Sequence, residues 1–295
     1  MSEQVPDKKR VTPKNLLNAV LIVLLMQLVA LLITYANAPV YVAIVDSSGP
    51  SFAPAGTSPE GSLLNAGFLV LFAFAATLGL LWALKRKMVF SFKALVFGSV
   101  SLSAFFLTFI TTDSLVAGAV PFELELVVDL AAASVVVGVI GYTIFVKNRP
   151  ILSSMVLAFV GAEVGAFFAG TLGLYTALIL PVAFAIYDIY AVFRGPLKQL
   201  IGTSPGVALN GMSVKLGEFT LGLGDVVFYT MLPSLAFLHT MVAPVVAPTA
   251  TVLTIAAIDF GVVATLFLLS KKRLLPGLPI PMLLGVGVLG TFLLA

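Results

Sequence analysis

The chain has 295 residues and a net charge of +3, and 60% of its residues are hydrophobic while only 10% are charged. A soluble domain carries about 25% charged and about 45–50% apolar residues, so this composition predicts a polytopic membrane protein. The absence of cysteine excludes disulfides, thiol nucleophiles and cysteine metal sites. A single histidine, His239, leaves little scope for a histidine metal site or a Ser-His-Asp triad.

Long apolar segments follow one another along the chain and are separated by short polar stretches. Each is long enough, at 1.5 Å per residue, to cross a hydrocarbon core of about 30 Å. Continuous apolar runs exclude a β-barrel, whose strands alternate. The sequence therefore predicts an all-α fold, with one nine-helix membrane domain over residues 1–295. The expected spans lie near 16–35, 65–84, 90–111, 124–146, 151–169, 172–193, 218–238, 250–270 and 275–295, with a loop over 37–62.

The basic residues set the expected orientation in the membrane. With the N-terminus in the cytoplasm, all 16 Lys and Arg lie in the tail (1–15) or in loops on the cytoplasmic side, including the loop 194–217. Such an asymmetry is the positive-inside pattern. It predicts a multi-pass protein of the cell membrane with its N-terminus inside and its C-terminus outside.

Two aspartates interrupt neighbouring apolar segments. Asp188 lies about five residues before the end of the sixth segment, and Asp225 lies about seven residues into the seventh. An aspartate at a helix centre in the membrane costs roughly 2.5–3.5 kcal/mol, so each needs a compensating role. At 1.5 Å per residue both carboxyls are expected roughly 8–10 Å inside the cytoplasmic boundary, which favours a single site.

A carboxyl pair at one depth has a specific chemistry. Two carboxyls a few ångströms apart cannot both ionise cheaply, so the pair shares one proton. The ionised member takes a proton from water while the protonated member polarises an amide carbonyl, and this chemistry needs no metal or cofactor. We expect Gly222 on the helical face of Asp225, Gly224 to loosen the helix, and Tyr187 and Tyr229 to donate hydrogen bonds within the site. A packing role for either aspartate alone remains open.

These residues resemble the paired signatures of a known family. Tyr187-Asp188 and Gly222-Leu223-Gly224-Asp225 are similar to the motifs of presenilins and signal peptide peptidases, the GxGD intramembrane aspartyl proteases, and Gly-Leu-Gly-Asp-x-x-Phe-Tyr is closer to presenilin. The family has a Pro-Ala-Leu motif at its last span. Pro276-Gly277-Leu278-Pro279 occupies that place here, with glycine for alanine.

The resemblance implies that Asp188 and Asp225 are the catalytic aspartates. Tyr187, Gly222, Leu223, Gly224 and Pro276 to Pro279 would support the site or bind substrate. The implied partners are transmembrane helices of substrate proteins, with their N-termini outside, and membrane lipid, with no nucleic acid, metal or cofactor. The short loop between the sixth and seventh spans and an outer face without Lys or Arg favour a single-chain, archaeal homologue.

Two other predictions concern the loop and the function class. Gly206–Leu209 and Met212–Val214 are expected to pair as strands with a substrate segment. The rival function is an ion- or proton-coupled transporter or channel that uses the intramembrane acids, Glu163 and Asp259 included. Such a transporter predicts internal repeats and broken helices near the midplane, and the sequence has no evident repeat. A prepilin peptidase is disfavoured because no lysine follows Asp225 over Val226 to Tyr229.

Overall fold

A computed structural model describes residues 13–48, 55–86, 88–146, 150–194, 213–216, 219–242, 248–271 and 275–293. The elements within these ranges are α1 (Pro13–Ser48), α2 (Pro59–Lys85), α3 (Val89–Val116), α4 (Phe122–Gly141), the π-helix η1 (Tyr142–Val146), α5 (Pro150–Thr171), α6 (Leu174–Phe193), β1 (Ser213–Leu216), β2 (Phe219–Gly222), α8 (Leu223–Val242), α9 (Thr249–Lys271) and α10 (Pro279–Leu293). Four helices begin at proline, which is favoured at the first helical position because the N–H there has no partner in any case.

The prediction of an all-helical membrane protein is confirmed. Seven helices in the described part of the chain are long and apolar enough to cross a membrane, namely α1 to α6 and α9 (α4 together with η1). The 20-residue α8 and the 15-residue α10 complete the helical set of the same ranges. Residues 195–212 of the predicted cytoplasmic loop, and with them Gly206–Leu209 and Met212, lie outside the described residues.

The first helix is longer than the sequence predicts. The expected loop from residue 37 begins inside α1, which continues through Pro39 to Ser48. Tertiary contacts hold this extension: Asn37 donates to the hydroxyl of Thr111 on α3 at 3.0 Å. The buried Tyr41 ring lies against Gly170 of α5, where a Cβ would overlap the ring. Packing therefore overrides the local preference of Pro39 for ending a helix.

The seventh predicted segment begins as a strand. Residues 219–222 form β2, which pairs antiparallel with β1 in a register that places Ser213 opposite Gly222. The helix begins only at Leu223, so Gly222 is the last residue of the strand. The expectation that Gly222 lies one helical turn before Asp225 is therefore wrong. Alternating burial along β2, with Phe219 and Leu221 inside, explains why this stretch adopts a strand.

Glycines set the closest helix contacts around α8. Gly161 and Gly165 of α5 face α8: a Cβ on Gly161 would lie 2.7 Å from Val226, and one on Gly165 would overlap the Thr230 hydroxyl. The spacing Gly-x-x-x-Gly lets two backbones approach closely in a membrane. This motif is visible in the sequence and predicts a close contact of α5 with another helix, which is α8 in the structure.

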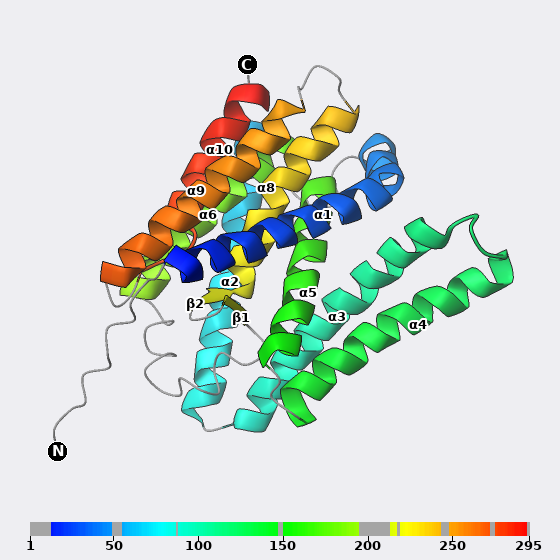
Figure 1. Ribbon diagram of the computed structural model, residues 1–295, viewed down its shortest axis with the longest axis horizontal. Helices are drawn as coiled ribbons and strands as arrows, with labels where there is room; N and C mark the ends of the chain where they lie inside the picture. Colours follow the sequence, from blue (N-terminus) through cyan, green and yellow to red (C-terminus); the bar gives the residue numbers. More distant parts are fainter. Residues whose placement is uncertain are drawn as a thin grey trace.

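The helix that carries Asp225 lies inside the bundle. Figure 1 shows α1 crossing α8, with α9 and α10 side by side and α3 and α4 forming a hairpin at one edge, where α3 also contacts α1 and α5. Met231, Leu232 and Leu235 of α8 are almost completely buried. The contacts of α8 with α1, α5, α9 and α10 fix its position, and therefore the position of the acid at its first turn.

Candidate active site

Asp225 is held by the local geometry at the start of α8. It is the third residue of the helix, and its Oδ2 accepts a hydrogen bond from the backbone N–H of Gly222 at 3.1 Å. This is half of a capping box, in which an acidic side chain in the first turn reaches back to the residue before the helix. The strand-to-helix junction therefore fixes the direction of the carboxyl.

Asp188 is held by a distant segment. It lies near the C-terminal end of α6, and its Oδ2 accepts a hydrogen bond from the backbone N–H of Leu278 at 3.1 Å. Gly277 contributes a second backbone N–H to the same carboxylate. Both donors belong to the segment 275–278, which is not helical and leads into α10.

Gly277 also lies against Asp225. A Cβ built on Gly277 would be 2.8 Å from Oδ2 of Asp225 and 3.2 Å from Oδ1. The hydroxyl of Tyr229, one turn along α8 from Asp225, donates to the carbonyl of Gly277 at 2.8 Å. The segment that binds Asp188 is thus tied to α8 at the position of Asp225, and glycine is the residue that leaves room for the carboxyl.

The structure brings the two aspartates to one place. Both carboxyls lie against the same short segment, because Leu278 donates to Asp188 and Gly277 lies against Asp225. The side chains of both aspartates are partly exposed. A pair of carboxyls that shares a face with backbone donors can activate water and polarise a carbonyl, which is general acid–base chemistry.

The other predicted supporting residues have different positions. Tyr187 points to α2, where its hydroxyl donates to Thr77 at 3.1 Å, so the expected hydrogen bond within the site is not formed. Leu223 opens α8 and packs near Gly161, and Gly224 has open space around its Cα. Pro276 to Leu278 precede α10, which begins at Pro279. Within this set the carboxyl pair is contacted by Gly222, Gly277 and Leu278.

Glu163 and Asp259, the other two acids of the predicted relay, interact with residues outside the aspartate pair. Glu163 is buried on α5 and accepts hydrogen bonds from Thr108 of α3 at 3.0 and 3.2 Å. Asp259 on α9 is hydrogen-bonded by Gln27 of α1, and Gln27 also donates to the Tyr229 carbonyl at 3.4 Å. Neither set of hydrogen bonds goes to Asp188 or Asp225, so these acids do not extend the pair into a relay of directly bonded carboxyls.

Comparison with known proteins agrees with the fold and the motifs. The family model described as signal-peptide peptidase, presenilin aspartyl protease matches residues 19–208, a segment that includes Asp188 and ends before Asp225. Presenilin-B of Dictyostelium discoideum is 36% identical over 122 residues, which are 38% of this chain and 24% of that relative. The aligned part therefore spans about a quarter of the curated relative.

Solved structures show the same architecture. A presenilin family intramembrane aspartate protease in space group C222 superposes with a TM-score of 0.59 at 19% identity, covering 92% of this chain and 98% of that one. A second structure of a presenilin family intramembrane aspartate protease, in space group P2, superposes with a TM-score of 0.55 at 22% identity. This match covers 91% of this chain and 95% of that one. The chain thus has the polytopic helical fold of these membrane proteins. It belongs to the signal-peptide peptidase and presenilin aspartyl protease family.

Proposed function

We propose that this protein is an intramembrane aspartyl protease that hydrolyses peptide bonds within transmembrane helices of other membrane proteins. One observation carries the proposal: Asp188 and Asp225, from different helices, both lie against the segment Gly277-Leu278. Membership of the family supports it. A transporter is not favoured, because Glu163 and Asp259 interact with Thr108 and Gln27 and not with the aspartate pair.

In the proposed reaction, the ionised aspartate accepts a proton from a water molecule, whose oxygen attacks the carbonyl carbon of the substrate amide. The protonated aspartate donates a hydrogen bond to the carbonyl oxygen and stabilises the charge that develops there. The tetrahedral intermediate then breaks its C–N bond, and the leaving nitrogen takes a proton from the pair. The reaction produces one carboxyl and one amino end, and the pair returns to its starting protonation state.

The supporting residues have separate roles in this proposal. The backbone N–H of Gly222 orients the carboxyl of Asp225. The backbone N–H groups of Gly277 and Leu278 orient the carboxyl of Asp188. Tyr229 keeps Gly277 against α8, and Pro276 and Pro279 restrict the backbone on either side. Substrate must unwind before its amide reaches the pair. The short β1–β2 sheet, whose end at Gly222 adjoins Asp225, offers a place where an unwound segment can add as a strand.

We also propose nine membrane spans with the N-terminus in the cytoplasm and the C-terminus outside. The distribution of Lys and Arg supports this orientation. The cysteine-free chain allows a direct test with single-cysteine variants and an impermeant maleimide. In intact cells Thr291→Cys should be labelled and Lys14→Cys should be labelled only after lysis. The reverse pattern would overturn the orientation.

The function is tested with purified protein and a single-span helical peptide in detergent, with products identified by mass spectrometry. Wild-type protein should cut the peptide within its apolar segment, with a dependence on pH set by the coupled pair. Asp188→Asn and Asp225→Asn should each abolish the cut while the protein keeps its helical content. Cleavage at wild-type rate by either variant would refute the assignment.

A further inference from the structure

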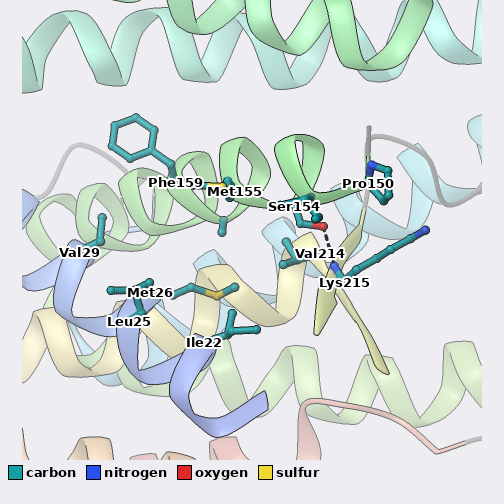
Figure 2. A pocket seen from close by; sticks show the side chains of 12 residues that line it. Ile22, Leu25, Met26, Val29, Pro150, Ser154, Met155, Phe159, Val214 and Lys215 are labelled. Atoms are coloured by element: carbon teal, nitrogen blue, oxygen red, sulfur yellow. Dashed lines mark hydrogen bonds between the residues drawn. The ribbon is translucent and has the colours of Figure 1, made fainter. Parts of the chain in front are cut away.

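An apolar pocket whose lining does not include the two aspartates lies between α1, α5 and the strand β1. Its volume is about 680 Å³, which is within the roughly 300–1,000 Å³ of ligand-binding pockets. Ile22, Met26 and Val29 of α1 form one wall, and Met155 and Phe159 of α5 form the other (Figure 2). The pocket is lined almost entirely by carbon and sulfur atoms, so its occupant must be apolar over most of its length.

One end of this pocket is polar and basic. There Lys215 of β1 extends past Pro150, the first residue of α5, and its side chain is exposed (Figure 2). The backbone N–H of Lys215 donates to the hydroxyl of Ser154 at 2.9 Å, which ties β1 to α5 at the same end. A ligand in the pocket would therefore meet the positive charge of Lys215 where the apolar walls end.

The pocket opens sideways to the surroundings of the protein. Residues on its rims are strongly exposed, with Ile151 at 77%, Met155 at 66% and Leu25 at 60%. In a membrane protein such apolar surface faces lipid chains. Along α5 the lining runs from Pro150 to Phe159, nine rises of 1.5 Å or about 14 Å. One leaflet of hydrocarbon is about 15 Å thick, half of a core of about 30 Å.

We propose that this pocket binds one anionic phospholipid, with an acyl chain between α1 and α5 and the headgroup phosphate at Lys215. The apolar lining, the length of one leaflet and the basic side chain of Lys215 at its end all fit that ligand.

The bound lipid would support the catalytic strand-to-helix junction. Val214 lines the pocket and is almost completely buried, and Ser213 beside it pairs with Gly222. Gly222 in turn donates to Asp225. The lipid site and the aspartate are thus joined through two paired strands, and occupancy would hold the donor of Asp225 in place. This regulatory consequence rests on the proposed function, whereas lipid binding itself does not.

The binding test uses the full-length protein in zwitterionic detergent with photoactivatable phosphatidylglycerol that carries its reactive group on the acyl chain. After irradiation, cross-links should fall on peptides that contain Ile22–Val29 and Met155–Phe159. Unlabelled phosphatidylglycerol should compete about five-fold better than phosphatidylcholine, the effect of about one basic residue near an anionic surface. Equal competition, or cross-links elsewhere only, would overturn the proposal.

Two variants and two matched controls locate the site. Lys215→Gln should remove the preference for phosphatidylglycerol, and Ala158→Phe should fill the pocket and reduce cross-linking of both lipids. Lys85→Gln and Ala75→Phe make the same chemical changes on α2, outside the pocket, and should leave labelling unchanged. All four should elute as folded protein in size-exclusion chromatography. The proposal would be contradicted if folded Lys215→Gln kept the preference for phosphatidylglycerol and folded Ala158→Phe cross-linked as much lipid as the wild type.

Activity provides a separate readout. In phosphatidylcholine liposomes, adding phosphatidylglycerol should raise peptide cleavage by the wild-type protein but not by Lys215→Gln. If lipid is bound as predicted but no peptide is cut under any condition, the proposed protease function fails while the lipid site stands. If peptide is cut and phosphatidylglycerol has no effect in either protein, the regulatory consequence is wrong.

Discussion

The two aspartates are held by contacts of very different range. Asp225 is bonded by Gly222, three residues earlier in the chain, and this contact needs only the junction of β2 with α8. Asp188 is bonded by Leu278, 90 residues later, and this contact exists only when α10 and its preceding segment lie beside α6. The half of the site around Asp225 therefore needs only local structure, whereas the half around Asp188 needs the complete helix bundle.

The largest expected effect comes from removing either carboxyl. Asp188→Asn or Asp225→Asn removes one partner of the acid–base pair and should lower the cleavage rate by at least about 10³-fold. Unequal losses would show that the two halves are chemically separable. Asp113→Asn, at an exposed position near the end of α3, is the matched control and should cleave at the wild-type rate. Rates come from product mass spectrometry at saturating peptide.

The substitution Gly261→Ala is expected to disturb only the half of the site that contains Asp188. A Cβ on Gly261 of α9 would lie 2.5 Å from the Pro281 Cα and 2.8 Å from its nitrogen, so Gly261→Ala should shift α10. Such overpacking costs about 1–3 kcal/mol of stability, and misplacing the partner of Asp188 by about 1 Å should cost about 10²-fold in rate.

The control for this change is Gly224→Ala, because Gly224 has open space where the new methyl would be, although it lies beside Asp225. Thermal unfolding and cleavage rates should separate the two variants. If Gly224→Ala loses more cleavage rate than Gly261→Ala, the half of the site around Asp225 is more sensitive to substitution than the half around Asp188. That result would contradict the expected order.

Gly277 is the point where the two halves meet. Gly277→Ala would place its methyl against the carboxyl of Asp225, which can rotate away, so we expect about a ten-fold loss of rate, below the 10²-fold of a full misplacement. Gly277→Val, with a branched side chain, should lose more. Thermal stability should change little in either variant. An unchanged rate in Gly277→Val would mean that the carboxyl does not need this space.

The smallest effect is expected from the hydroxyl that links α8 to the segment before α10. Tyr229→Phe removes its bond to the Gly277 carbonyl and should cost about 1–2 kcal/mol of stability with a few-fold loss of rate. Tyr187→Phe removes a comparable hydroxyl contact, with Thr77 of α2, and should leave the rate of cleavage closer to that of the wild type. Equal losses of cleavage rate in the two variants would mean that the bond from Tyr229 to Gly277 has no specific role in catalysis.

Local patterns predicted much of this molecule. Apolar length indicated the helices, and the depth of Asp188 and Asp225 indicated that they meet. The start of α8 was predicted wrongly, because Phe219 to Gly222 are apolar enough for a helix and become a strand only by pairing with β1. The extension of α1 depends on contacts of Asn37 and Tyr41 with distant helices. The bond from Leu278 to Asp188 joins residues 90 positions apart, which no local pattern specifies.

The central claim is that the two carboxyls act as one unit, and binding of a transition-state mimic tests it most directly. The ligand is a helical peptide with a hydroxyethylene group in place of the scissile amide, because such mimics bind at least about 10²-fold more tightly than substrates. Its Kd is measured for the wild type, Asp188→Asn, Asp225→Asn and the double variant. We predict that each single variant binds the mimic at least about 10²-fold more weakly than the wild type does, and that the double variant binds it no more weakly than the single variants. Two losses that multiply in the double variant, or no loss in either single variant, would contradict the account.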